Sequence, residues 1–279
     1  MKYAIIIVIL FLSNLFAQKE EMSQDSINFS YYHIIANNLD LDIVNSYPQR
    51  IIKYISRKSP YEIVIKTFSD NQDHKREQLM RTKLFKRINK SCQYYKEVKE
   101  YLEPTPLIES NLSLIKDIAD TLVNYDSSLI NNLEKILKWV SAYVKYDNEL
   151  AKQISDGKIS TQSALKTLEC KKGTCSEYKN LFIAIMRYLG IPTRFIVGVI
   201  SERDHTMYHA WAECYIEGAG WHEVDPQTAQ VWKPAMGIKL FAGKDFMDCN
   251  IKVLPDIKAT VKKTSCSELR LKCSRVCQA

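Results

Sequence analysis

The chain has 279 residues, of which 46% are hydrophobic and 25% are charged. This length and composition are sufficient for one well-buried domain and a second, smaller one. The formal net charge of +7 is modest, and the sequence contains no internal repeat, no low-complexity segment and no EF-hand loop. We therefore expect neither a nucleic-acid-binding protein nor a calcium-dependent one.

The N-terminus has the pattern of a secretory leader. Met1 and Lys2 precede an apolar run at residues 3–12, and Ala17 stands just before a polar segment. A helix of about fifteen residues rises only ~22 Å, which is less than the ~30 Å hydrocarbon core of a bilayer. We predict that residues 1–17 are a signal peptide and that the protein is exported, to the periplasm or outside the cell. The alternative is an uncleaved anchor, in which case membrane contact occurs only through this leader.

Residues 18–105 carry no chemical motif and form the predicted N-terminal accessory region. The segment 61–68 is rich in β-branched and aromatic residues, which predicts a strand. A basic run at residues 75–90 has seven Lys and Arg residues against one acidic residue. In an exported protein we interpret this run as a solvated face or as an attraction to an anionic surface, not as a nucleic-acid site.

Two amphipathic helices are predicted from about residue 107 onward, each with one apolar stripe at helical spacing. The first stripe contains Leu114, Ile115, Ile118, Ala119 and Leu122, and the second contains Leu129, Ile130, Leu133, Ile136, Leu137, Val140 and Val144. The second helix is expected to end at Tyr146. The side chain of Tyr146 is expected in the core, and the alternative is that it lines an oxyanion site.

A cysteine stands at the start of the next predicted helix. Apolar residues recur there at helical spacing, at Tyr178, Leu181, Phe182, Ile185 and Leu189. Gly190 and Pro192 then give a stop signal. Because Gly173 and Thr174 break the chain just before this run, Cys175 falls on the first turn of a helix of about fourteen residues. Free N–H groups and the helix dipole favour an anion at that position, and the thiolate is the reactive form of cysteine.

Three strands are predicted after this helix. Residues 193–200 read as a buried strand, 201–206 as a polar loop, 209–216 as a half-buried strand with alternating faces, and 221–225 as a third strand. His209 begins the second strand and Asp225 ends the third. Two neighbouring antiparallel strands can bring an imidazole and a carboxylate within hydrogen-bond reach, although the sequence does not determine the register.

Two runs of sequence carry a resemblance to a known family. They are GTCSEYKNLFIAIMRYLGIPTRFIVGV, which contains Cys175, and HAWAECYIEGAGWHEVDPQ, which contains His209 and Asp225. In this order and spacing they resemble the core of the transglutaminase-like superfamily, in its bacterial exported branch that includes cysteine proteases. The resemblance covers roughly residues 101–255. It implies an α+β, papain-like fold for a catalytic domain at residues 106–255, with helices packed on an antiparallel sheet and the nucleophile at a helix N-terminus.

The same resemblance implies a role for each of three residues: Cys175 as nucleophile, His209 as base, and Asp225 as the carboxylate that orients the base. It implies acyl transfer from amides of peptides or proteins through a thioester. The reaction would end in hydrolysis, as in a peptidase or amidase, or in transfer to an amine, as in a protein-glutamine transglutaminase. The expected substrate is a peptide or protein, with cell-wall peptide among the candidates, and neither a cofactor nor a metal is expected. The alternative is a catalytically silent binding module of the cell envelope.

A zinc site is the rival interpretation of the same residues. Cys170, Cys175, His205 and His209 are zinc-type ligands. We disfavour this site because a whole helix and a strand separate the two pairs, and because the thiols would have to stay reduced in an exported protein. His205 and His222 are expected to lie outside the chemistry.

The eight cysteines fit an exported protein. With Cys175 free and Cys214 on the apolar face of its strand, the remaining six allow fifteen connectivities that the sequence does not distinguish. Three of these six are in residues 256–279, a Cys-rich tail that we expect to be tied to the body of the protein. Cys170 lies five residues before the proposed nucleophile. A Cys170–Cys175 disulfide would abolish activity and would therefore act as a redox latch.

Overall fold

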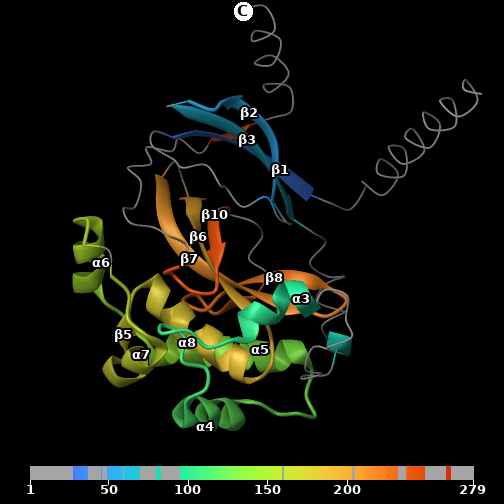
Figure 1. The fold of residues 1–279 in the computed structure, drawn as a ribbon, viewed down its shortest axis with the longest axis vertical. Coiled ribbons are helices and arrows are strands. Elements are labelled where there is room, and N and C mark those ends of the chain that lie inside the picture. The colour runs from blue at the N-terminus through green and yellow to red at the C-terminus, as the bar shows by residue number, and fades with distance from the viewer. Residues whose placement is uncertain are drawn as a thin grey trace, which may run out of the picture.

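The structure, a computed structural model, has the expected α+β architecture (Figure 1). It describes residues 28–36, 45, 49–58, 60–69, 80–82, 95–158, 160–202, 205–231, 237–248 and 262–264. The predicted signal peptide, most of the basic run and five cysteines lie outside these residues: Cys92, Cys249, Cys266, Cys273 and Cys277. Within the described residues, no helix combines the length and the apolar composition needed to cross a bilayer.

A five-stranded antiparallel sheet, in the order β10-β6-β7-β8-β9, lies at the centre of the fold. Its strands are β6 (Thr193–Glu202), β7 (His205–Ile216), β8 (Gly220–Asp225), β9 (Gln230–Val231) and β10 (Gly237–Gly243). The three predicted strands are therefore present. The predicted loop at 201–206 is wrong, because β6 and β7 stay paired up to Glu202 and His205. Backbone pairing does not require apolar side chains, so the polar composition did not mark the ends of the strands.

From Ala210 to Ile216, strand β7 is buried on both faces, not on one as predicted. Ala210, Ala212, Cys214 and Ile216 belong to the main core. On the other face, Glu213 is fully buried between Arg194 and Lys239. Its Oε2 lies 2.6 Å from Arg194 Nε, and its Oε1 lies 2.8 Å from Lys239 Nζ. Two cationic partners allow a carboxylate to be buried, so the strand that was predicted to be half-buried is an interior strand here.

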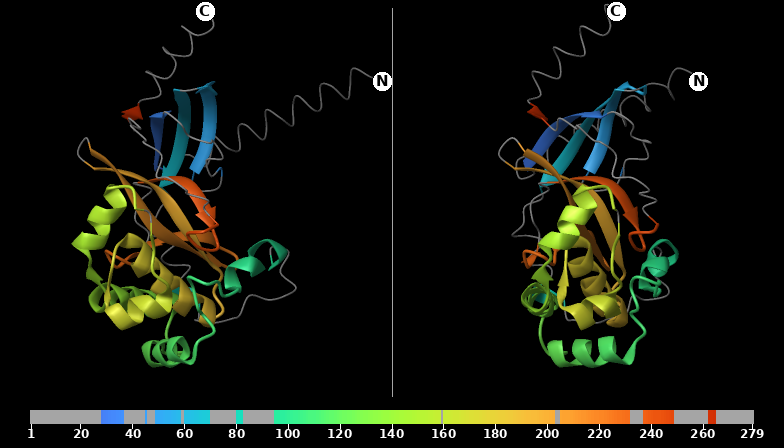
Figure 2. Two further views of the ribbon diagram at one scale, coloured as in Figure 1. Left: turned by 60° about the vertical axis from the view of Figure 1, so that its left-hand side comes forward. Right: turned by 90° about the vertical axis from the view of Figure 1, so that its left-hand side faces the viewer.

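Helices cover one end of this sheet, and the four-stranded sheet lies at the other (Figure 2). The helices are α4 (Ser113–Leu122), α5 (Leu129–Tyr143), α6 (Asn148–Ser155), α7 (Ala164–Cys170) and α8 (Cys175–Tyr188). Shorter elements are α3 (Tyr95–Val98), the 3-10 helix η2 (Lys99–Leu102), and a parallel pair of two-residue strands, β4 (Lys145–Tyr146) and β5 (Lys172–Gly173).

Helix α8 is the central helix of the core and begins at Cys175, as predicted. All residues from Ser176 to Arg187 are buried, because α8 packs against β6, β7, α4, α5 and α7. The predicted stripes on the outer helices are buried as well, at Ile115, Ala119 and Leu122 of α4 and along α5 from Leu129 to Val140. Leu114 is the exception, since it is 46% exposed on the first turn of α4.

The four-stranded sheet has the order β11-β1-β3-β2 and is antiparallel. Its strands are β1 (Asn28–Ala36), β2 (Gln49–Ser56), β3 (Tyr61–Ser69) and β11 (Lys262–Thr264). Strand β3 contains the predicted strand of the accessory region, whereas β11 comes from the predicted C-terminal tail. Apolar residues of β1 and β3 form a second core with Val199, Ile238 and Leu240. The amide of Gln49 bonds both the N–H and the carbonyl of Lys239, which joins the two sheets.

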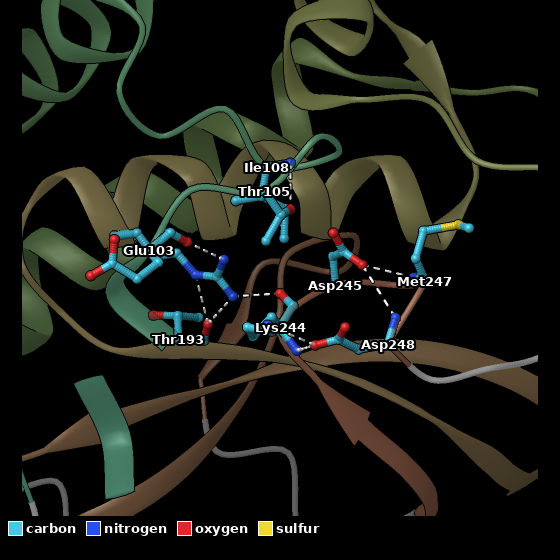
Figure 3. Close-up of polar contacts among 9 residues, drawn as sticks. Glu103, Thr105, Ile108, Thr193, Lys244, Asp245, Met247 and Asp248 are labelled. Carbon is cyan, nitrogen blue, oxygen red and sulfur yellow. Dashed lines mark hydrogen bonds and ion pairs between the residues drawn. The ribbon is translucent and has the colours of Figure 1, made fainter. Parts of the chain in front are cut away.

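One buried cation joins three segments beside the C-terminal end of α8 (Figure 3). The Arg187 guanidinium donates to the carbonyl oxygens of Glu103 at 2.8 Å, Thr193 at 2.8 Å, and Lys244. Burial lowers the pKa of Arg187 to about 10, and the nearby Asp245 carboxylate is the main group that opposes this shift. The segment before α4, the start of β6 and the segment after β10 are therefore held to α8 by a single side chain.

Candidate active site

The start of α8 is held by a buried carboxylate. Glu177 Oε2 accepts hydrogen bonds from Thr174 N at 2.7 Å and from Thr174 Oγ1 at 2.8 Å. Its other oxygen, Oε1, accepts from Thr161 Oγ1 at 2.9 Å and from Gln162 N at 2.8 Å. A Cβ atom on Gly173 would lie 2.1 Å from the Cβ of Glu177, so only glycine fits at this approach. These contacts fix the backbone at the start of α8, where Cys175 is the first helical residue.

Cys175 is that first residue, and its thiol is partly buried. Burial raises the pKa of the Cys175 thiol, but a hydrogen bond with His209, the positive charges of Lys179 and His209, and the backbone N–H of Ala210 lower it. The net result is a thiol pKa below the ordinary value. A thiolate at neutral pH is the form that attacks carbonyl carbons.

The pairing of β7 with β8 brings the second and third predicted residues together. Ala212 lies opposite Val224, which places Asp225, at the end of β8, diagonally across from His209. His209 Nε2 lies 2.9 Å from Asp225 Oδ2. Because Nε2 is engaged with the carboxylate, Nδ1 is the ring nitrogen left to interact with the sulfur of Cys175.

Asp225 is nearly enclosed and has a partner for each oxygen. Oδ2 faces His209, while Oδ1 accepts from Gln227 N at 3.0 Å and lies 3.4 Å from Lys179 Nζ. Burial raises the pKa of Asp225, but the Lys179 charge, the hydrogen bond and charge of His209, and the Gln227 N–H outweigh it. The Asp225 pKa therefore lies well below its usual range, and the carboxylate is ionised at any pH at which the protein would be assayed.

Lys179 and Glu177 were missed by the sequence analysis. Both lie within one turn of Cys175, on a helix in which only the apolar positions and the cysteine were interpreted. Lys179 is 0% exposed and Glu177 is 0% exposed. Charged residues next to the apolar positions of this helix were the available signal, because such groups are buried only with partners.

Tyr146 lies neither at the end of the predicted helix nor in the core, where its side chain was expected. Helix α5 ends at Tyr143, and Tyr146 lies on β4, opposite Gly173 of β5. The side chain is 48% exposed, so the predicted core position is wrong. Burial raises the pKa of the Tyr146 phenol, and the charges of Cys175 and Glu177 raise it further, which places this ring beside the start of α8.

The described side chains form no zinc site. No group of three His, Cys, Asp or Glu side chains lies close enough there to hold a metal ion. Cys170 is a free, exposed thiol at the end of α7, and Cys175 is also free, so the structure shows no bond between them. His205 begins β7, while His222 is buried on β8 opposite Cys214.

Comparison with known proteins finds a family that matches the part of the chain in which this site lies. Residues 116–226 match the transglutaminase-like superfamily, and this range contains Cys175, His209 and Asp225. This part of the chain is a transglutaminase-like core. The family accounts for the α+β arrangement in which helix α8 begins beside the sheet.

Relatives of the transglutaminase-like core occur in distant organisms. An uncharacterized protein of Haemophilus influenzae is 27% identical over 158 residues, which is 49% of this chain and 42% of that protein. A UPF0252 protein of Methanocaldococcus jannaschii is 29% identical over 91 residues, which is 32% of this chain and 25% of that protein. The chain therefore spans less than half the length of these curated relatives.

A solved structure shares the fold over most of the chain. It is a Cytophaga hutchinsonii protein described as a "Putative Cysteine Protease", with a TM-score of 0.58 and 17% identity. The match covers 87% of this chain and 92% of that one. At this identity the likeness establishes the fold alone.

Proposed function

We propose that this protein catalyses cysteine-dependent acyl transfer on amide bonds of peptides or proteins, with Cys175, His209 and Asp225 as its catalytic residues. One observation carries the proposal. A thiol with a lowered pKa is hydrogen-bonded to an imidazole whose other nitrogen lies 2.9 Å from an ionised carboxylate. This arrangement supplies a nucleophile, a proton carrier and a group that orients the carrier.

The first half of the reaction forms a thioester. The Cys175 thiolate attacks the amide carbonyl, and the oxygen becomes negatively charged at the N-terminal end of α8, where backbone N–H groups are free to stabilise it. The His209 imidazolium then gives its proton to the leaving amine as the carbon–nitrogen bond breaks. Asp225 stabilises the imidazolium during this step without taking up a proton.

The second half of the reaction breaks the thioester. Neutral His209 accepts a proton from water, which yields a carboxylic acid, or from a primary amine, which yields a new amide, and the Cys175 thiolate leaves. The first outcome is that of a peptidase or amidase, and the second is that of a transglutaminase. A solved structure of the same fold is described as a "Putative Cysteine Protease", which is consistent with hydrolysis.

One incubation distinguishes these outcomes. Reduced protein is incubated with casein and a fluorescent primary amine, and label incorporation, new peptide termini and ammonia are measured together. Label in casein indicates transfer, whereas termini or ammonia without label indicate hydrolysis. Cys175→Ala is expected to abolish all three signals, and Cys170→Ser, which changes an exposed thiol, serves as the matched control. Full turnover by Cys175→Ala would overturn the proposal.

The alternative is a silent binding module of the cell envelope, and the same assay tests it. A protein that gives no signal on casein or on cell-wall peptide, while Cys175 still reacts readily with iodoacetamide, would favour that alternative. We also propose that the protein is exported, on the strength of the leader-like residues 1–17. N-terminal sequencing of the protein from its native host tests this, because a mature chain that begins near residue 18 is expected.

A further inference from the structure

A lysine is buried beneath the proposed nucleophile. Lys179 lies one helical turn after Cys175 on α8, and its side chain is 0% exposed. The surrounding positions of α8, such as Phe182 and Ile183, are apolar core residues. A buried ammonium group costs several kcal/mol unless a partner compensates it, so its position requires an explanation.

The partner is Asp225. Lys179 Nζ lies 3.4 Å from Asp225 Oδ1, while Asp225 Oδ2 is 2.9 Å from His209 Nε2. The carboxylate therefore lies between a fixed cation and the imidazole. Two occupied oxygens restrict rotation of the carboxylate, and this fixes the oxygen that the imidazole uses.

The charges of the site explain why a cation is useful there. In its reactive form the site holds a Cys175 thiolate, a His209 imidazolium and an Asp225 carboxylate, which together carry one negative charge. Lys179 brings the sum to zero inside a region that is largely closed to water. In such a region an uncompensated charge is much more costly than at the surface.

We propose that Lys179 is a positioning residue that holds the Asp225 carboxylate in one orientation and stabilises the Cys175 thiolate with its positive charge. This inference rests on the proposed function, since it concerns the same thiol. Among the described residues, the ionisable groups that act electrostatically on the thiol or on the Asp225 carboxylate, apart from Lys179 itself, include Cys175 on the same helix, His209 from β7 and Asp225 from β8, and the Tyr146 phenol on β4 is coupled to Cys175.

The test measures thiolate formation directly and does not depend on turnover. The rate of iodoacetamide modification of Cys175 is followed by peptide mass mapping from pH 5 to pH 9, with the exposed Cys170 as a reference thiol in the same molecule. For Lys179→Met we expect modification at pH 6 to be roughly tenfold slower than in the parent protein, because a nearby opposite charge favours the anion. The Cys170 rate is expected to stay constant.

A matched lysine provides the control. Lys239 is also buried, and it contacts the Glu213 carboxylate at 2.8 Å on a different part of the sheet. Lys239→Met therefore removes an equivalent buried charge without touching Asp225, and its Cys175 profile is expected to match that of the parent. An equal slowing in both variants would show a general loss of structure and would overturn the inference.

A second variant separates charge from hydrogen bonding. Lys179→Gln keeps a hydrogen-bond donor near Asp225, so it is less disruptive to the fold than Lys179→Met. Because the glutamine carries no charge, Cys175 is expected to react as slowly as in Lys179→Met. Circular dichroism verifies that both variants are folded. Parent-like profiles in the folded variants would overturn the role of Lys179 and leave the proposed function intact. The proposed function fails instead if Cys175→Ala retains turnover.

A histidine variant tests whether Lys179 acts on the thiol independently. In His209→Ala, the additional change Lys179→Met is expected to slow Cys175 modification by a further severalfold, because the ammonium contributes to the field at the sulfur by itself. If the second substitution changes nothing in this background, the direct effect on the thiolate is wrong.

Discussion

Glu177 and Thr174 bind each other across the first turn of the helix that carries Cys175. A single carboxylate oxygen of Glu177 accepts both the backbone N–H and the hydroxyl of Thr174, at 2.7 Å and 2.8 Å. The other oxygen holds residues 161 and 162, which are distant in the sequence. The proposed nucleophile is thus positioned by a carboxylate two residues away that takes no part in the proposed chemistry.

Replacing Glu177 by Gln tests this arrangement. An amide NH2 group replaces one of the two acceptor oxygens, and this new donor faces existing donors in a fully buried site. We expect the free energy of unfolding to fall by about 3 kcal/mol, because hydrogen bonds to buried charged groups are lost. The decrease in melting temperature reports this loss of stability. Glu169→Gln, at an exposed carboxylate three residues from Lys166, should change the melting temperature little. An equal decrease for both substitutions would contradict the role of Glu177.

Local signals explain which parts of the fold were predictable. A Gly-Thr break followed by a helical apolar period places Cys175 at the start of α8, and both observations come from neighbouring residues. The β-branched run at β6 and the alternation along β7 are local as well. These signals sufficed to select the proposed nucleophile, the imidazole and the carboxylate as candidates.

The rest depends on contacts between segments distant in the sequence. The pairing of Ala212 with Val224 decides that His209 and Asp225 meet, and side-chain alternation does not determine register. The strand that carries Glu213 was predicted to be half-buried, but Arg194 and Lys239 come from other strands to enclose this carboxylate. A buried charge is predictable only once its partners are known.

The Asp225→Asn substitution tests the orienting role. An amide keeps the size of the side chain but removes the charge that stabilises the imidazolium and leaves Lys179 without its counterion. We expect kcat to fall by about a hundredfold or more, with a smaller change in KM. Steady-state kinetics measure both constants, and Asp248→Asn, at an exposed carboxylate, is the control. A kcat within a factor of two of the parent value would contradict this role.

The lowered pKa of Cys175 determines the acid side of the pH profile. The thiolate is the reactive form, so kcat/KM is expected to be high at neutral pH and to fall as the pH drops through the thiol pKa, where the sulfur becomes protonated. An ordinary thiol, with a pKa of about 8.5, would instead lose activity already below pH 8. A profile of kcat/KM from pH 4 to pH 9 distinguishes the two cases.

Cys214 is expected to be inert in the folded protein. Burial raises its pKa to about 12, and its sulfur is packed in the core, 3.7 Å from Thr193 Oγ1. Since the raised pKa keeps the thiol protonated below that value, iodoacetamide at pH 8 should leave Cys214 unmodified until urea unfolds the chain. Mass mapping before and after unfolding measures this. Modification of Cys214 in the folded protein at a rate similar to that of the exposed Cys170 would contradict its burial.

Arg187→Met should destabilise the protein more than any surface substitution. The change removes the guanidinium from the carbonyl oxygens of Glu103, Thr193 and Lys244 and removes a positive charge that interacts electrostatically with the buried Asp245. We expect a loss of about 3–5 kcal/mol in the free energy of unfolding, the usual result of removing one partner of a buried charged network.

Arg57→Met is the matched control, because Arg57 is exposed and contacts only the ring of Tyr54 among the interactions described for it. Its effect should stay within about 0.5 kcal/mol. Urea titrations of both variants measure the difference. Since Arg187 joins three segments around α8, its loss should also lower kcat through displacement of the helix, even though it lies at the opposite end from Cys175. A stable Arg187→Met variant with normal kcat would show that apolar packing alone holds α8 against the sheet.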